Sequence, residues 1–249
     1  MALEQVEAVL FDMGGTLVDY PLPSRPALAV RCVRGAISFL VRPEAELLPP
    51  AARLPSPEVA HGRRRRAGPE TALAHRAAIA LRRVIRAVSG HTLPQMAEAC
   101  LRPIVIEGRA YGDTLTTLRA LVERGYRLGL ISNTPWGTPD YLWEQQAEKF
   151  GLAGLLQVRL FSSDVGVRKP DPRIFLEALR RLGVPPERAL FVGDAPVEDI
   201  GGAAGVGMRT ALVVRGGRFP DACRHPPDLR VSGLQELLDH LPRAAREKS

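Results

Sequence analysis

The chain has 249 residues, 45% of them hydrophobic, and a formal net charge of +7. This length accommodates one large domain or a domain with an insertion, and the sequence has no apolar run of about 18 residues that could cross a membrane. Glutamates precede the first apolar run, where a secretory signal would be basic, and the three cysteines are widely spaced. We therefore expect a globular protein of the reducing cytoplasm.

The predicted elements alternate between strands and helices. The first is a short apolar run at residues 6–11, which ends before a pair of glycines and is expected to be a buried strand. From residue 113 onward, segments with helical spacing of apolar residues alternate with short apolar runs. We expect helices at 113–124, 139–150, 172–182, 196–204 and 234–240, and strands at 126–132, 156–161, 189–192 and 210–214.

This alternation predicts an α/β fold with a Rossmann-like parallel sheet as its core and helices on both faces. The core is expected to comprise residues 1–19 and 108–249. Residues 20–107 separate the first strand from the second and have helix-like apolar spacing in places, so we expect them to form an all-helical cap. Within this cap, residues 43–69 are rich in proline, alanine and arginine and are predicted to form a long exposed loop.

The basic excess lies entirely in the predicted cap. Residues 20–107 hold 14 arginines and six acidic residues, and they include the stretch HGRRRRAG at 61–68. No aromatic residue lies between positions 40 and 110, which speaks against recognition of nucleic acid by base stacking. We favour a solvated basic loop, then an electrostatic funnel for phosphorylated metabolites, and only then a surface that binds nucleic acid.

Polar residues follow four of the predicted strands. Because the carboxyl ends of parallel strands meet at one edge of the sheet, and ligands bind there, these side chains are expected to gather. They are Asp12 after the first strand, Ser132 and Asn133 after the second, Lys169 in the loop after the third, and Asp194 with Glu198 and Asp199 after the fourth.

Each of these residue types has a chemical use and an ordinary structural one. Asp12 lies next to a Gly-Gly turn whose free N–H groups could cradle a phosphate, so it could act as a nucleophile, or it could simply cap the turn. Ser132 and Asn133 could donate hydrogen bonds to phosphate oxygens or fill a turn. Lys169 could neutralise a nucleophile and a transferring phosphoryl group, or be a solvated loop lysine.

The aspartates after the fourth strand suit a metal ion. Asp194 and Asp199 are hard oxygen ligands of the kind that Mg²⁺ takes together with substrate phosphate. Alternatively, acidic residues at this position complement the dipole of the following helix, which accounts for Glu198 better than for Asp194.

Taken together, these motifs resemble the haloacid dehalogenase superfamily of hydrolases. The resemblance rests on Asp12-Met13-Gly14-Gly15-Thr16-Leu17, Ser132-Asn133, Lys169-Pro170 and Gly193-Asp194 followed by Asp199. It implies that Asp12 is the nucleophile and that Ser132, Asn133 and Lys169 hold the phosphate, with Lys169 also fixing Asp12. It further implies that Mg²⁺ is bound by Asp12, the backbone carbonyl of Gly14, Asp194 and, in support, Asp199, while Thr16 positions the turn.

Gly14 departs from the family's phosphatases, which have there a second aspartate that serves as general acid and base. Such help is typically worth about 10²–10⁴ in rate. Two family branches also lack this aspartate. A metal-free dehalogenase would gain nothing from gathered carboxylates, and a Schiff-base phosphonatase needs a cap lysine, of which residues 20–107 have none. Substitute acids could come from His61, Glu70, His75 or His91, while Asp19 is expected near the hinge into the cap.

The sequence therefore predicts a Mg²⁺-dependent hydrolase that acts on a small phosphorylated metabolite through a phosphorylated Asp12, slowed by Gly14. The alternative is a protein of the same fold that binds a phosphorylated ligand or regulates without turnover. The substrate and the oligomeric state are left open.

Overall fold

The fold is described from a computed structural model, which places residues 3–20, 101, 107–135, 138–215 and 225–243. The expected cap at 20–107 lies outside the described residues except for Tyr20, Leu101 and Glu107. The division into core and cap, and the character of the Arg-rich loop at 43–69, therefore stay predictions.

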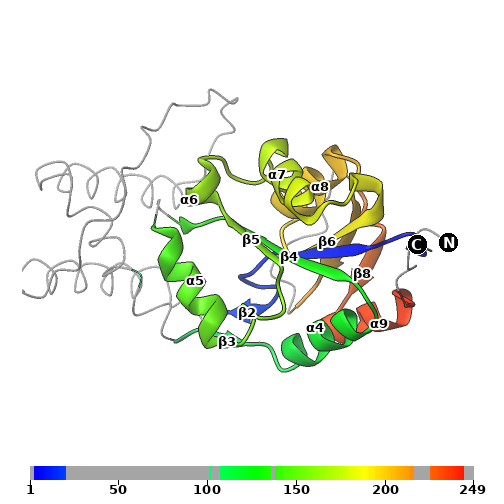
Figure 1. Cartoon of the computed structure of the whole chain (residues 1–249), viewed down its shortest axis with the longest axis horizontal. Helices are drawn as coiled ribbons and strands as arrows, with labels where there is room; N and C mark the ends of the chain where they lie inside the picture. The colour runs from blue at the N-terminus through cyan, green and yellow to red at the C-terminus, as the bar shows by residue number, and fades with distance from the viewer. Residues whose placement is uncertain (1–2, 21–100, 102–106, 136–137, 216–224, 244–249) are drawn as a thin grey trace, which may run out of the picture.

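The core of the described chain is a six-stranded parallel sheet, with β1 in its middle (Figure 1). The strand order is β5-β4-β1-β6-β7-β8, so the first strand in the chain pairs with β4 on one side and β6 on the other. The strands are β1 (Ala8–Phe11), β4 (Arg127–Ser132), β5 (Val158–Phe161), β6 (Ala189–Gly193), β7 (Arg209–Val213) and β8 (Leu229–Val231).

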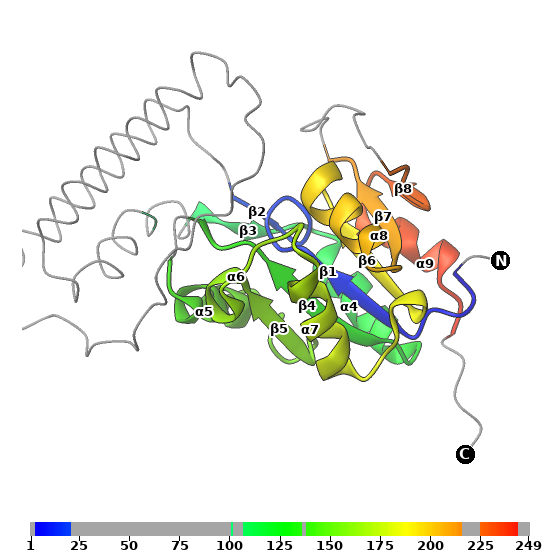
Figure 2. The ribbon, with the colours of Figure 1, turned by 90° about the horizontal axis from the view of Figure 1, so that it is seen from above.

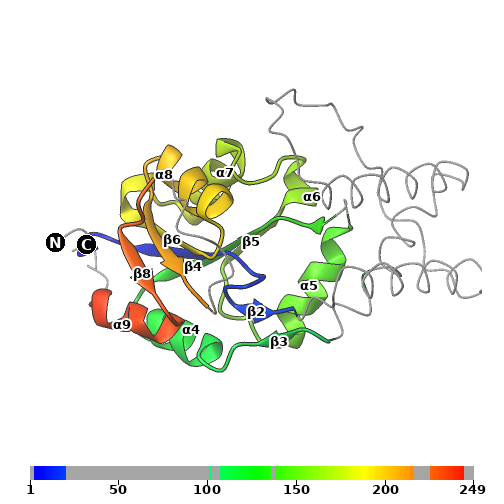
Figure 3. The ribbon, with the colours of Figure 1, turned by 180° about the vertical axis from the view of Figure 1, so that it is seen from behind.

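Helices cover both faces of this sheet, as Figures 1 and 3 show from opposite sides. One face carries α4 (Thr114–Glu123), α5 (Asp140–Lys149) and α9 (Leu237–His240) with the short turn η5 (Leu234–Glu236). The other carries α7 (Pro172–Leu182) and α8 (Gly202–Gly205). The predicted α/β architecture is confirmed.

The central strand shows why both layers are needed. Val9 and Phe11 pack into the core on the α4 side, whereas Ala8 and Leu10 pack into the core on the α7 side. All four side chains are fully buried, because successive residues of a strand point to opposite faces. An apolar run without polar alternation therefore becomes a strand buried on both sides.

Helix α7 follows its sequence signals closely. Asp171 caps its start by accepting a hydrogen bond from the N–H of Arg173 (3.0 Å), and Pro172 occupies the first turn. Gly183 ends the helix at φ +65°, a conformation that glycine adopts without strain. The observed bounds equal the predicted ones.

Some elements were not predicted. Strand β2 (Val18–Asp19) pairs antiparallel with β3 (Arg109–Ala110), and Figure 2 shows the two side by side at the carboxyl end of β1. The short elements α6 (Ser162–Val165) and η3 (Pro186–Arg188), like β8, have too few residues for a periodic pattern. The predicted helix at 196–204 divides into a π-helical turn, η4 (Pro196–Gly201), and α8.

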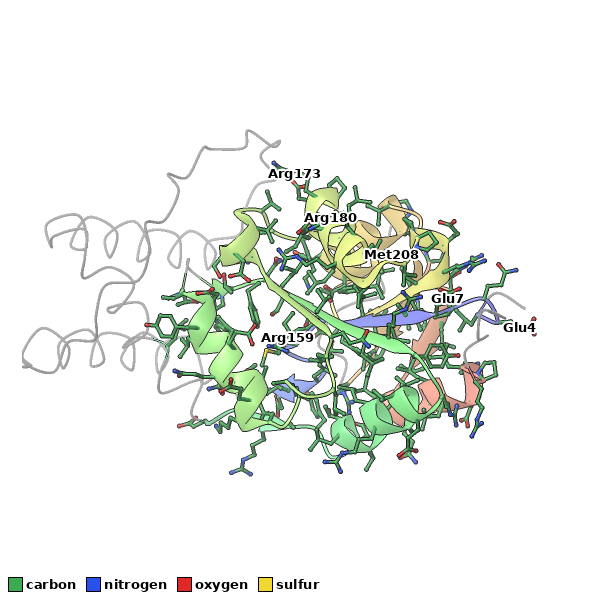
Figure 4. All side chains as sticks on the ribbon, viewed as in Figure 1. Glu4, Glu7, Arg159, Arg173, Arg180 and Met208 are labelled. Carbon is green, nitrogen blue, oxygen red and sulfur yellow. The ribbon has the colours of Figure 1, made fainter. Side chains whose placement is uncertain are left out.

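The amino end of the sheet is held by ion pairs. Glu7, labelled in Figure 4, precedes β1 and accepts a hydrogen bond from Arg127 at 2.9 Å and another from Arg188. One glutamate thus pairs with two arginines at this end of the sheet, and all three side chains are partly exposed.

Among the described helices, none has both the length and the apolar character that a bilayer-spanning segment requires.

Candidate active site

Asp12 stands directly after β1, at the centre of the carboxyl edge of the sheet. Its N–H donates to the carbonyl of Val192 in β6 at 2.9 Å, which continues the strand pairing by one residue. The chain then turns: the N–H of Gly15 donates to the carbonyl of Val18 at 2.8 Å. The Asp12 residue is only 8% exposed, so its carboxylate lies in a nearly closed position.

Gly15 is required by the close approach of Asp194. Gly15 has φ +88°, and a β-carbon there would lie 2.0 Å from the Oδ2 of Asp194. No side chain larger than hydrogen fits such a space. The second glycine of the Gly-Gly turn thus lets the carboxylate that follows β6 lie against the loop that follows β1.

Gly193 has the same function for Asp199. A β-carbon at Gly193 would lie 2.3 Å from the Oδ2 of Asp199. That oxygen accepts a hydrogen bond from the N–H of Ala195 at 2.9 Å, which orients the carboxylate back toward the strand end. Asp199 lies in the π-helical turn η4, an element that is often found at functional sites, and is 1% exposed.

Lys169 joins two of these carboxylates. Its Nζ lies 2.6 Å from Oδ1 of Asp12 and 2.7 Å from Oδ1 of Asp199, and it also donates to the carbonyl of Ile131 at 2.9 Å. Lys169 is 4% exposed. Two hydrogen bonds and an ion pair to a second carboxylate surround this buried ammonium, and paired charges of this kind are the ones that proteins tolerate in buried positions.

Asn133 holds the backbone of this lysine. Its Oδ1 accepts a hydrogen bond from the N–H of Lys169 at 2.9 Å, and its Nδ2 donates to the carbonyl of Lys169 at 3.1 Å. The amide of Asn133 thus positions Lys169, a use that the sequence did not suggest. Ser132 is buried at the end of β4. Contact of either side chain with a phosphate stays a prediction.

Asp12, Asp194 and Asp199 form a cluster with one oxygen of each within 4.8 Å of the others. Three carboxylates and one ammonium leave a formal charge of −2 at the site. Hard oxygen donors at this spacing fit a small divalent cation such as Mg²⁺, whose remaining ligands are typically waters and substrate phosphate. The residues present therefore fit the predicted metal, and they meet where the sequence placed them.

The protonation of the pair follows from burial and charge. Burial raises the pKa of Asp12 to about 6, against the lowering effect of Lys169, and the charge of Asp199 adds to the rise. Burial alone would lower the pKa of Lys169, but the two aspartates outweigh it and raise that pKa above 10.5. Near neutral pH the lysine is therefore charged, and Asp12 is available as a carboxylate.

Tyr20 is a residue of this site that the sequence analysis missed. A β-carbon on Gly14 would lie 3.5 and 3.7 Å from the Cδ2 and Cε2 atoms of its ring, which meets Trp143 edge-to-face at 6.0 Å. The hydroxyl oxygen is buried and has no hydrogen-bond partner within the described ranges. The position of Tyr20 directly after β2 was the only available signal, and β2 itself was not predicted.

Two arginines near the site were also missed. Arg168 donates to the carbonyl of Thr134, and burial lowers its pKa while the charge of Glu198 opposes that change. Arg215 lines a depression beside Asp194, stacked 3.9 Å from the ring centre of Tyr111. Neither belongs to a sequence motif. The packing of a loop places Arg168 near the site, and the end of a strand places Arg215 there. The histidines and glutamate considered as substitute acids (His61, Glu70, His75 and His91) lie outside the described residues.

The arrangement has the parts needed for nucleophilic displacement at phosphorus. A carboxylate is held by a lysine at the base of the site, and two further carboxylates stand beside it to hold a divalent cation. Phosphoryl transfer requires mainly positioning and neutralisation of charge, which such a set supplies.

Relatives of this chain include phosphatases. It is 36% identical to a glyceraldehyde 3-phosphate phosphatase from Methanopyrus kandleri over an alignment of 142 residues. This alignment covers 56% of this chain and 59% of the relative. It is 39% identical over 148 residues to a phosphoserine phosphatase from Thermus thermophilus, covering 57% and 55%. The chain thus matches little more than half the length of these curated relatives.

The fold has close counterparts among solved structures. A crystal structure described as a HAD phosphatase from Thermococcus onnurineus superposes with a TM-score of 0.62 over 96% of this chain and 99% of the other, at 23% identity. At this identity the likeness shows the fold. Residues 6–207, from β1 to the turn before β7, match the family described as haloacid dehalogenase-like hydrolase. The chain therefore belongs to the haloacid dehalogenase-like hydrolase family, as its motifs indicated.

Proposed function

We propose that this protein is a Mg²⁺-dependent phosphatase that hydrolyses a small phosphorylated metabolite through a phosphorylated Asp12. The observation that carries the proposal is the bridge made by Lys169 between Asp12 and Asp199 beside Asp194. It leaves one buried carboxylate oriented as a nucleophile and a surplus of negative charge suited to a divalent cation.

In this proposal each residue of the site has a distinct role. An oxygen of Asp12 attacks phosphorus, forming a P–O bond while the bond to the leaving oxygen breaks. Lys169, Ser132 and Asn133 hold the phosphate oxygens, and Lys169 keeps Asp12 ionised and oriented. Mg²⁺ held by Asp12, the carbonyl of Gly14, Asp194 and Asp199 would neutralise charge on the transferring group. Water then cleaves the acyl phosphate and restores the carboxylate.

Gly14 determines which substrates react well. Without an acid at this position, the leaving oxygen departs with little help from a proton donor, which slows esters whose leaving groups are basic. The proposal therefore includes a preference for reactive phosphates over simple alkyl esters. Two of the relatives are a glyceraldehyde 3-phosphate phosphatase and a phosphoserine phosphatase, which supports a small metabolite as the substrate class.

The first experiment measures hydrolysis of p-nitrophenyl phosphate with Mg²⁺ and with EDTA, in the wild type and in Asp12→Asn. We expect activity that requires Mg²⁺ and is lost in the variant. Asp239→Asn is the matched control, because Asp239 is an exposed aspartate of α9, which packs beside α4 away from the site. Equal rates in wild type and Asp12→Asn would remove Asp12 as the nucleophile.

A second experiment separates turnover from binding. Rapid acid quench during turnover, followed by mass measurement of a peptide that contains Asp12, should show one added phosphoryl group. A binding or regulatory protein of the same fold would take up phosphate and Mg²⁺ but give no product on a panel of phosphorylated metabolites. Halide release from a 2-haloacid, insensitive to EDTA, would instead indicate dehalogenation.

A further inference from the structure

The side chain of Tyr20 borders the space that a residue at position 14 would use. A β-carbon on Gly14 would already be in van der Waals contact with two carbons of the Tyr20 ring, at 3.5 and 3.7 Å. Backbone pairing brings the two residues together: Gly14 bridges to Val18, and Tyr20 follows two residues later. The Tyr20 ring therefore borders position 14 at a distance that still leaves room for a β-carbon there.

The Tyr20 hydroxyl lies in a position that calls for an explanation. The ring is fixed edge-to-face against Trp143, which is itself anchored by a hydrogen bond from its Nε1 to the hydroxyl of Thr138 at 2.9 Å. The hydroxyl oxygen is closed off from solvent and lacks a hydrogen-bond partner in the part of the chain that the structure describes. A buried hydroxyl without a partner is costly, so a group that accepts its hydrogen bond is expected during function.

We propose that Tyr20 takes the place left empty by Gly14 and donates a hydrogen bond from its hydroxyl to the leaving oxygen of the bound phosphate ester. This inference rests on the proposed phosphatase function and adds to it a catalytic residue outside the family's motifs. Tyr20 acts as a hydrogen-bond donor rather than as a source of the proton.

The surroundings of Tyr20 favour that role. Burial, and then the negative charge of Asp12, raise the pKa of Tyr20 above its usual value, so the phenol keeps its proton throughout the working range. The nearby Asp12 repels any negative charge on the phenol oxygen. A donor that stays neutral gives most help when negative charge develops on its acceptor, as on the leaving oxygen in the transition state.

The reaction balances without a proton from the protein. As Asp12 attacks, the electron pair of the broken P–O bond remains on the leaving oxygen, which accepts the hydrogen bond from Tyr20 and takes its proton from water. The hydroxide so formed is neutralised by the proton released when a second water attacks the phosphorylated Asp12. The net reaction is ester plus water to alcohol plus inorganic phosphate, with both Asp12 and Tyr20 unchanged.

The test is Tyr20→Phe, which removes the hydroxyl and keeps the ring. Rates are measured with Mg²⁺ on a series of aryl and alkyl phosphates whose leaving groups differ in pKa. A lost hydrogen bond to a developing charge should lower kcat about 10–100-fold for the most basic leaving groups and far less for p-nitrophenyl phosphate. KM should change little, because the bond strengthens only in the transition state.

Tyr126→Phe is the matched control. The Tyr126 hydroxyl donates to the carbonyl of Pro242, and Tyr126 precedes β4 at the amino end of the sheet, so its loss tests a tyrosine hydroxyl far from the site. We expect the same dependence on leaving group as in the wild type. A steeper dependence confined to Tyr20→Phe supports the inference, since a merely structural role would lower all rates alike.

The two proposals fail in different ways. If the wild type is active, Asp12→Asn is inactive and Tyr20→Phe follows the wild type across the whole series, the role of Tyr20 is overturned and the phosphatase stands. If the wild type and Asp12→Asn hydrolyse the esters equally, the phosphatase is overturned and the role of Tyr20 with it.

Discussion

A β-carbon on Gly15 would lie 2.0 Å from the Oδ2 of Asp194, so the carboxylate of Asp194 fills the space that a side chain at position 15 would need. The two residues follow different strands, β1 and β6. The turn after β1 and the carboxylate after β6 are thereby fitted to each other before any ligand binds. Such close fitting holds catalytic groups in place at no further cost during the reaction.

Gly15→Ala should abolish Mg²⁺-dependent phosphatase activity while leaving the protein folded. The added methyl group has to displace Asp194 from the carboxylate cluster, in addition to the strain of a positive φ, which costs about 1–2 kcal/mol. Steady-state rates and Mg²⁺ titration by calorimetry are the measurements.

Gly207→Ala provides the control for backbone strain. Gly207 has φ +90°, and its nearest neighbour to a β-carbon would be Pro186 at 3.8 Å, an ordinary contact. Both variants should lose similar stability, but only Gly15→Ala should lose Mg²⁺ affinity. Wild-type affinity in Gly15→Ala would contradict the role of Asp194 as a ligand.

Lys169→Met should lower both activity and stability. The change leaves the buried carboxylates of Asp12 and Asp199 without their cation, a loss expected to cost about 3–5 kcal/mol in the free energy of unfolding at neutral pH. The pKa of Lys169 is raised in the folded state, so its contribution is complete at pH 7 and is lost only when the pH rises through that value. Urea unfolding measures the difference.

The pH dependence of this deficit has a definite sign. Without Lys169 the pKa of Asp12 should rise above its present value of about 6, since the lysine lowers it. Acidification then protonates the unpaired carboxylate of Asp12, so the deficit should shrink as the pH falls toward 5. Lys149→Met, which changes an exposed lysine at the end of α5, should show neither effect. A deficit independent of pH would contradict this explanation.

The acid limb of activity should move with Mg²⁺ concentration. Asp12 must be ionised to attack, and burial raises its pKa to about 6 in the metal-free protein. A divalent cation beside the carboxylate favours the ionised form and lowers this pKa. Profiles of kcat/KM against pH should therefore show a limb near pH 6 at low Mg²⁺ that shifts to lower pH as Mg²⁺ increases. NaCl at matched ionic strength should leave the limb in place.

Gly14→Asp should speed the hydrolysis of esters with basic leaving groups. It supplies the general acid that the site lacks, worth at most the 10²–10⁴ typical of such groups, and the Tyr20 ring beside position 14 should keep the gain toward the lower end. Gly14→Asn has nearly the same shape and no acid, so it should show no gain. Equal rates in the two variants would mean that Gly14 does not limit turnover.

Much of this site follows from the order of residues along the chain. Short apolar runs ending at Asp12, Ser132 and Asp194, separated by helical segments, predict a parallel sheet, and parallel strands bring their carboxyl ends together whatever the details of packing. The loop lysine, Lys169, could be assigned to this edge for the same reason. The alternation is a local property, so the sequence displays it directly.

Other features depend on contacts between distant segments. Gly15 could be recognised as a turn residue, but its fit against Asp194 depends on how β1 and β6 lie side by side. Asn133 was predicted to hold phosphate, and only the fold reveals that its amide also holds the backbone of Lys169. Tyr20 belongs to no sequence motif, and its significance depends on the packing of a two-residue strand.

The sequence by itself determined the family, the parallel core and the set of groups that meet at its edge, because strand periodicity and right-handed connections act over short stretches of chain. Only the tertiary structure decided that Lys169 pairs with both Asp12 and Asp199 and that Tyr20 stands beside Gly14. The 2.6 Å bond from Lys169 to Asp12 joins residues 157 positions apart, and a distance of that kind is set by the packing of whole layers against one another.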